Sequence, residues 1–166
     1  DTMIVVDRAI LDSLISVGYD LSKVCVSHVT NCENLFNGKS TFNDDISKWD
    51  VADVVNMRRM FRDAEDFNQD IGLWDVASVV NMSEMFKNAQ SFNQDISGWD
   101  VSNVENMNSM FSEALIFNRP IGSWDVSSVT DMSWMFANTS HFNQNINAWD
   151  VSNVTNMGGV FSGAAS

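Results

Sequence analysis

The sequence predicts an α/β repeat solenoid, in which successive turns of the chain use the same 25-residue pattern. Three observations predict it: an unbroken 25-residue period, a strand-like and a helix-like pattern within each period, and a folding composition with 45% apolar and 19% charged residues. We expect a right-handed coil with one short parallel strand and one short helix per 25-residue turn, because units of this kind bury their apolar faces only by stacking.

The period is carried by aromatic, aliphatic and Met residues that recur without an insertion. Each unit begins with Phe-Asn, continues to Ile and then Trp-Asp-Val, and ends with Met and a second Phe. The leading phenylalanines are Phe42, Phe67, Phe92, Phe117 and Phe142, and the tryptophans are Trp49, Trp74, Trp99, Trp124 and Trp149. We expect these ladders to form one continuous core, which leaves no reason to divide the chain into two domains.

We therefore interpret residues 1–166 as a single solenoid domain. Its parts are an N-terminal helical lead-in (1–16), a degenerate repeat (17–41), four full repeats (42–66, 67–91, 92–116 and 117–141) and a last repeat (142–166). Extending the 25-residue register backwards also predicts inward positions in the lead-in, at Ile10, Leu11, Leu14 and Val17.

Two hydrophobic periods are present within each turn. Around Trp49-Asp50-Val51 apolar and polar residues alternate, which is the strand pattern, and such strands would pair in parallel about 4.8 Å apart. The next apolar residues fall at Met57, Met60, Phe61 and Ala64. This i, i+3, i+4, i+7 spacing predicts about two turns of helix, with Asn56 as its N-cap.

The segment Ile46-x-x-Trp49-x-Val51 has the L-x-x-L-x-L spacing of leucine-rich repeats. More specifically, "FNQDISGWDVSNVENMNSMFSEA" (residues 92–114) resembles a bacterial surface-protein repeat of about 25–26 residues, found in mycoplasma lipoproteins and Gram-positive surface proteins. The resemblance covers residues 42–166 closely and 17–41 loosely. It implies an extracellular or cell-surface protein with a leucine-rich-repeat-like coil and no catalysis.

Charge and cysteine content bear on the class of partner. A net charge of −13 points away from nucleic acid, whose phosphates require clustered Lys and Arg, and it disfavours an anionic membrane surface. No apolar run is long enough to form a spanning helix, so we expect no membrane insertion by this segment. Cys25 and Cys32 are too few for a disulfide framework, and their different phases in the repeat disfavour a bond between them.

The residues that catalysis would need are scarce. His28 and His141 fall at different phases of the repeat, far apart along the stack, and the sequence has no nucleotide-binding or zinc-binding motif. We therefore predict a protein that is not an enzyme, with no catalytic residue, no cofactor and no metal ligand.

An Asp ladder is the one feature of the repeat that raises an electrostatic question. Stacked carboxylates repel by roughly 0.9 kcal/mol even in water, so something must offset the repulsion. Either each carboxylate accepts the backbone N–H two residues on, or cations such as Ca²⁺ bind between coils. The members are Asp50, Asp75, Asp100, Asp125 and Asp150. The Asn ladder that starts at Asn43 is interpreted as structural, through amide hydrogen bonds along the stack.

Candidate contact residues are those at variable or terminal positions. Exposed side chains on the side of the stack are predicted to meet a partner, at Leu73, Leu115, Ile116, Trp134 and His141. Apolar residues at the two ends are predicted to associate, at Ile4, Val5, Val6, Val151, Val154, Val160 and Phe161.

These ends predict a structural scaffold that acts by protein–protein contacts, including head-to-tail self-association into a filament. The alternative is an adhesion or ligand-binding module cut from a longer surface protein. The partner is accordingly a second copy of the chain or another surface or host protein.

Overall fold

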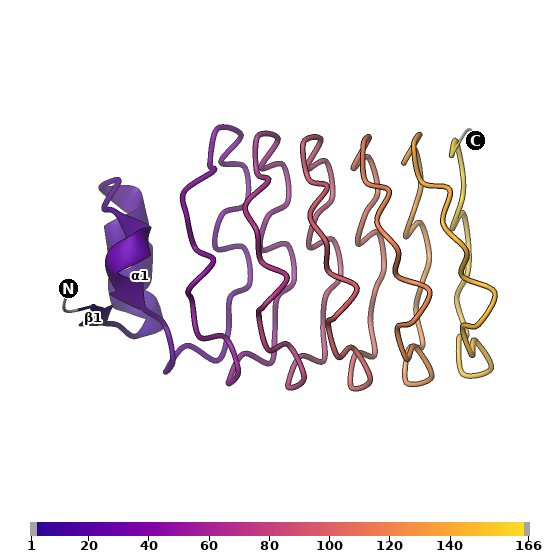
Figure 1. Cartoon of the computed structure of the whole chain (residues 1–166), viewed down its shortest axis with the longest axis horizontal. Coiled ribbons are helices and arrows are strands. Elements are labelled where there is room, and N and C mark those ends of the chain that lie inside the picture. The colour runs from indigo at the N-terminus through magenta and orange to yellow at the C-terminus, as the bar shows by residue number, and fades with distance from the viewer. Residues whose placement is uncertain (1–2, 165–166) are drawn as a thin grey trace.

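The computed structural model describes residues 3–164 and shows a repeat fold, in which 25-residue coils stand in a row with the two ends of the chain at opposite ends (Figure 1). The helices and strands all lie at the N-terminal end. They are β1 (Ile4–Val5), α1 (Arg8–Ser16), the 3₁₀ helix η1 (Leu21–Lys23) and β2 (Val24–Cys25). β1 pairs in parallel with β2, and α1 stands against the first coil (Figure 1).

A ladder of backbone hydrogen bonds joins each coil to the next. Alternate residues of one coil donate their N–H to a carbonyl of the following coil: Met57 to Asn81 at 2.9 Å, Arg59 to Ser83 at 3.0 Å and Phe61 to Met85 at 2.9 Å. The same bonds recur in the following coils. Isolated parallel bridges mark where each ladder starts, at Asn31–Asn56, Asn56–Asn81, Asn81–Asn106, Asn106–Asp131 and Asp131–Asn156.

The predicted helix of each repeat is wrong. Between ladder bonds the chain makes tight turns, in which Met60 N–H donates to the Met57 carbonyl and Ala64 N–H to the Phe61 carbonyl, each at 3.1 Å. The third residue of each turn, Arg59 and then Asp63, has φ of 56° and 57°, as a type II turn requires and an α-helix excludes. Consecutive turns therefore produce the same i, i+3, i+4, i+7 spacing of buried side chains as a helix.

The strand predicted around Trp49 is wrong as well, although the alternation of its side chains is confirmed. Trp49 and Val51 are buried and Asp50 is exposed. The backbone there turns instead of extending, since Trp49 N–H donates to the Ile46 carbonyl at 3.1 Å and Val54 N–H to the Val51 carbonyl at 2.9 Å. The coils pair where the helix was predicted, from the Asn56 position onward.

The core is the set of ladders that the period predicts. Phe61, Phe86 and Phe111 stack on one another with ring centroids 5.6 and 5.7 Å apart, nearly parallel. The tryptophans of the ladder are buried except Trp149, which is half-buried, and each donates its indole N–H to a carbonyl of the preceding coil, as Trp74 does to Ile46 at 3.2 Å. Burial of these aromatic rings with their polar atoms satisfied stabilises the contact between neighbouring coils.

The N-terminal end departs from the 25-residue register. Ile4 pairs with Val24, whereas the register of the later coils would place it opposite Val29, so the lead-in does not continue the phases of the repeat. Leu11 is fully buried and Leu14 partly buried, as predicted, but Ile10 and Val17 are exposed, and the prediction for these two residues is wrong. A regular α-helix, with its N-cap Asp7 accepting from Ile10 N–H at 2.9 Å, replaces the turns of the later coils.

Candidate contact surfaces at the ends and on the side of the stack

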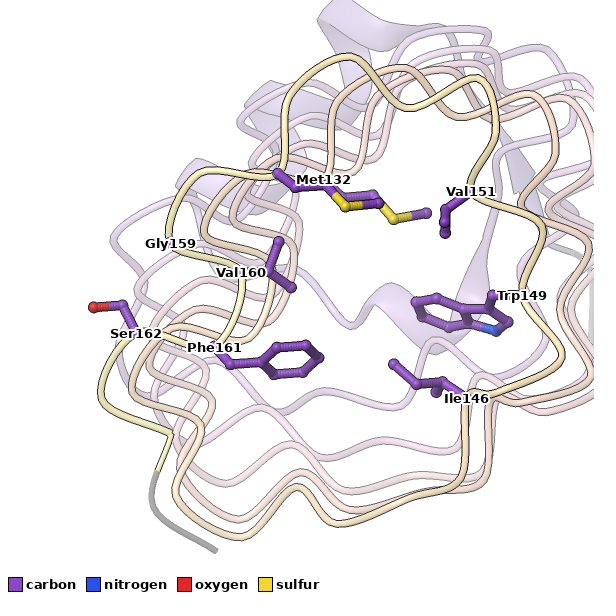
Figure 2. A pocket seen from close by; sticks show the side chains of 9 residues that line it. Met132, Ile146, Trp149, Val151, Gly159, Val160, Phe161 and Ser162 are labelled. Carbon is purple, nitrogen blue, oxygen red and sulfur yellow. The ribbon is translucent and has the colours of Figure 1, made fainter.

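The last coil carries an open apolar surface, the C-terminal face, formed by Ile146, Trp149, Val151, Met157 and Phe161. These side chains surround a hollow of about 490 Å³, and Figure 2 shows the rings of Trp149 and Phe161 pointing into it while Ser162 points away. Phe161 is 51% exposed, Met157 45% and Val151 38%. Val154 and Val160 are half-buried beside them.

The C-terminal face has the composition of a coil–coil interface that lacks its second half. One turn earlier, Val126, Met132 and Phe136 occupy the positions of Val151, Met157 and Phe161 and are almost wholly buried. The exposed area is therefore the side of the repeat that contacts the next coil elsewhere in the stack. Contiguous exposed apolar surface of this kind is typical of an interaction site.

The backbone of the last coil matches this description. In the preceding coil, Met132, Trp134, Phe136 and Asn138 donate their N–H groups to the last coil. The groups at the same positions one turn later have no acceptor among residues 3–164: Met157, Gly159, Phe161 and Gly163. The C-terminal face thus combines an apolar hollow with a row of available hydrogen-bond donors.

The N-terminal end is closed in a different way. The Arg8 guanidinium donates to the carbonyls of Asn31 at 2.8 Å and Glu33 at 3.0 Å, the two positions whose counterparts in later coils accept ladder N–H groups. The Nε of the same guanidinium donates to Asp12 Oδ1 at 2.9 Å. The Arg8 side chain of α1 therefore supplies two hydrogen-bond donors that, in later coils, are backbone N–H groups of the preceding coil.

β1 leaves apolar side chains at this closed end. Ile4 is 43% exposed and Val5 56%, so both predicted contact residues are accessible. Val6 is only 2% exposed and packs in the core, so its assignment as a contact residue is wrong. It donates its N–H to the Cys25 carbonyl at 3.1 Å and belongs to the fold of the cap.

The side of the stack carries the remaining predicted contact residues at separate places. Leu73 is 95% exposed beside a shallow hollow lined by Asp70, Gly72 and Asp95. Leu115 and Ile116 lie near His141, whose Nδ1 is 2.8 Å from the Leu115 carbonyl. Trp134 lines a third depression, lined also by Ser109 and Glu113 among other residues.

Each Asp of the ladder accepts a hydrogen bond within its own turn. Asp100 accepts from Ser102 N–H at 3.0 Å and from the Ser102 hydroxyl at 2.6 Å, and the Asp50 carboxylate accepts from Ala52 N–H at 3.3 Å. The Ser102 hydroxyl and N–H lower the pKa of Asp100, which favours its charged form. The interpretation as turn caps is confirmed. Within residues 3–164 no three His, Cys, Asp or Glu side chains gather as a metal site would require.

The Asn ladder is structural, as predicted. The side-chain oxygen of every Asn of the ladder except the last accepts the backbone N–H of the Asn one turn later. Asn43 accepts from Asn68 and Asn68 accepts from Asn93, each at 2.9 Å. Gln69 adds a bond to the Asn43 carbonyl at 2.8 Å.

The reactive side chains do not meet. His28 lies in the first coil and His141 near the far end of the stack, and among residues 3–164 neither has a Cys or an acidic side chain as a partner. Cys25 and Cys32 are both free thiols, and burial raises the pKa of Cys32 to about 12, which suppresses its thiolate. This arrangement supplies no nucleophile–base pair.

Residues at both ends of the stack were missing from the predicted contact residues. Met157 belongs with Phe161 on the C-terminal face, and its position in the repeat, the same as that of the buried Met132, was a sufficient signal to include it. Arg8 could not have been found, because a single Arg in an amphipathic helix carries no sign of what its guanidinium reaches.

The comparisons with known proteins give a family but no function. One family model, described as "Mycoplasma protein of unknown function, DUF285", matches residues 9–119 and, in a second overlapping match, residues 70–166. No curated protein and no solved structure matches the chain. Among the described residues, no helix is long and apolar enough to cross a membrane.

Proposed function

Because the chain belongs to the DUF285 family of Mycoplasma proteins of unknown function, we propose a role from its surfaces: it is a non-enzymatic extracellular or cell-surface scaffold that acts by protein–protein contacts. We further propose that its coils form a right-handed, leucine-rich-repeat-like solenoid. The periodic core, the absence of a nucleophile–base pair among residues 3–164 and the position of the apolar surface at one end support this role.

The observation that carries the proposal is the C-terminal face. It exposes Met157 and Phe161, which occupy core positions of the repeat, around a hollow of about 490 Å³. Covering this face removes apolar area from water, which favours association. No other described surface combines apolar side chains with a row of free N–H groups in this way.

The contact we propose is head-to-tail self-association. The opposite end exposes Ile4 and Val5 of β1, which offer an apolar counterpart from a second copy. Arg8 already occupies two ladder carbonyls there, so the contact rests on apolar burial at the strand rather than on a continued ladder. Two unlike surfaces joined in this way form a heterologous contact, and repetition of that contact builds a filament.

A second candidate function is adhesion to, or binding of, another surface or host molecule through the side of the stack. It is favoured by Leu73, 95% exposed, and by Trp134, 50% exposed, which are large apolar side chains at positions where other coils carry small or polar residues. This role requires no contact between the ends.

Negative-stain electron microscopy of the purified chain, with light scattering over a range of concentrations, tests the proposal. Head-to-tail association predicts fibres whose repeat along the axis equals the length of one stack, and scattering that rises with concentration. A monomer at every concentration would contradict self-association and favour the second candidate.

A further inference from the structure

A groove of about 370 Å³ lies on the side of the stack, and its lining comes from three consecutive coils, those of residues 67–91, 92–116 and 117–141. Its lining consists of Lys87, Ser109, Ser112, Glu113, Trp134, Ala137 and Asn138. The two Ser residues and Ala137 are buried, whereas Trp134 and Asn138 are exposed. Its volume lies within the range of small-molecule sites, about 300–1,000 Å³.

Trp134 supplies a flat apolar surface to this groove. Its ring lies over Gly159 of the next coil so closely that a Cβ atom at that position would be 2.7 Å from the indole. The backbone of Trp134 has φ of 58°, the left-handed conformation that all coils adopt at this position. The ring is therefore supported on the Gly159 side, and it is still 50% exposed.

The polar groups around the ring are available for a ligand. Among residues 3–164, the structure gives no intramolecular hydrogen bond or ion pair to the side chains of Lys87, Ser109, Ser112, Glu113 and Asn138. The Trp134 indole N–H has no acceptor in this part of the chain either, whereas Trp49, Trp74, Trp99, Trp124 and Trp149 each donate to a carbonyl. Hydroxyl, amide, ammonium and carboxylate groups thus surround one aromatic surface.

The same side of the stack, one and two coils earlier, provides an internal comparison. There the equivalent positions hold Arg59 and Glu84, and Glu84 accepts from Arg59 at 2.8 Å and from Arg62 at 2.8 Å. Asn88 donates to Asp63 at 3.0 Å. In those coils the charged groups satisfy one another, so the repeat by itself does not produce a groove with unpaired polar groups.

From this contrast we propose that the Trp134 groove is a carbohydrate-binding site, which takes a pyranose ring of a glycan. A pyranose has a face of C–H groups, which packs on an indole, and an edge of hydroxyls, which both donate and accept hydrogen bonds. Glu113 and Asn138 supply acceptors, and Lys87 and Asn138 supply donors. Because one basic and one acidic side chain line the groove, it suits a neutral polyol better than an ion of either sign. The site is independent of the end-to-end contact proposed above.

Nuclear magnetic resonance of the indole N–H signals tests this inference on the intact chain. Methyl glycosides of glucose, galactose, mannose and N-acetylglucosamine are titrated separately, and the six Trp signals are followed. We expect at least one sugar to shift the Trp134 signal in a saturable way, with a Kd in the range of about 1 mM. The five core indoles, which are bound to carbonyls, should not move.

Matched variants use residues that the repeat already accepts at the same positions. Trp134→Ser introduces the residue of the preceding coil (Ser109), and Glu113→Asn the residue of the neighbouring coils (Asn88 and Asn138), so both should fold. Trp134→Ser removes the Trp134 signal itself, so its sugar binding is followed by saturation transfer to the sugar protons. Binding should weaken by roughly tenfold or more in each variant, and remain unchanged in Leu73→Gly on another part of the side.

Two results would overturn the inference. One is the absence of any saturable shift of the Trp134 signal with all the glycosides. The other is saturation transfer that persists at full strength in Trp134→Ser, which would place the sugar elsewhere on the chain. Fibre formation does not enter either readout, so the two proposals stand or fall separately.

Discussion

The first and the last coil of the stack differ in what covers their outer side. At the N-terminal end, α1 buries Leu11 against the first coil, and Arg8 donates to the carbonyls of Asn31 and Glu33. At the C-terminal end, Met157 and Phe161 stay exposed, and the ladder N–H groups of the last coil have no acceptor among the described residues. A coil of this repeat is therefore complete only when something covers it.

The difference between the two ends shows that a cap must supply both apolar burial and ladder hydrogen bonds. Each internal coil gains apolar burial and ladder hydrogen bonds from both neighbours. The N-terminal cap supplies apolar burial through a helix and part of the ladder through one guanidinium, whereas no residue among 3–164 supplies either to the C-terminal face. An apolar surface with free donors tends to associate, for the same reason that an open sheet edge does.

The comparison is tested most strongly by removing the same ring from the interior and from the end. Phe111→Ala deletes a fully buried ring that stacks on Phe86 and Phe136 at 5.7 and 5.8 Å, and should lower the free energy of unfolding by about 3–5 kcal/mol. Phe161→Ala deletes a half-exposed ring and should cost only about 1–2 kcal/mol. Urea unfolding at low protein concentration measures both. Equal losses would show that the end is covered in solution.

The N-terminal cap is tested by Arg8→Lys. A Lys ammonium cannot reproduce the forked geometry that reaches two carbonyls and Asp12 together, so we expect a loss of about 1–2 kcal/mol in urea unfolding. The N–H groups of the first ladder, including Cys32, should also exchange faster with deuterium. Lys87→Arg, which changes a side chain without an intramolecular partner among residues 3–164, is the control. A stable Arg8→Lys variant would contradict the capping role.

The smallest effect is a pH dependence at the turns near the ends. The Lys23 ammonium and the Ser22 hydroxyl lower the pKa of Asp20 to about 2 from 3.8. The stability that this carboxylate contributes is therefore present above pH 3.8 and is lost as the pH falls toward about 2. Asp20→Asn should flatten the dependence of the urea midpoint on pH in that interval. Asp150→Asn should flatten the profile less. The hydroxyl and backbone N–H of Ser152 lower the pKa of Asp150, and no basic side chain contributes. Identical pH profiles for both variants and the unchanged chain would refute the assignment.

Most of the core could be predicted from the sequence, because its register repeats without a break. The Phe, Ile, Trp, Val and Met ladders are buried where the period places them, and the Asp and Asn side chains act within turns and along the stack. The helix of each repeat was predicted wrongly, because the spacing of Met57, Met60, Phe61 and Ala64 fits consecutive turns as well as a helix. Only φ separates the two. The second positive-φ position of the unit carries Gly, Asn or Asp in most coils, which is a signal that the prediction did not use, at Gly38, Asp63, Asn88, Asn138 and Gly163.

The candidate surfaces were predictable to different degrees. Exposed Leu73 and Trp134 stood out, because they occupy positions that other coils fill with smaller or polar residues. The burial of Val6 and the exposure of Ile10 and Val17 were not predicted. β1 pairs with β2 outside the 25-residue register, and no repeated residue in this part of the sequence indicates that shift. The groove beside Trp134 depends on which neighbours satisfy one another, and that is a property of the folded stack.

Sedimentation velocity over a range of concentrations tests the central claim, that the C-terminal face is a contact surface, most directly. Three chains are compared: the unchanged protein, the double variant Met157→Asp with Phe161→Asp, and Leu73→Asp as a control that adds one charge on the exposed side. The account predicts that the unchanged chain and the control sediment faster as concentration rises, while the double variant, still folded by circular dichroism, stays a monomer. An unchanged chain that is monomeric throughout, or a double variant that associates as before, would contradict it.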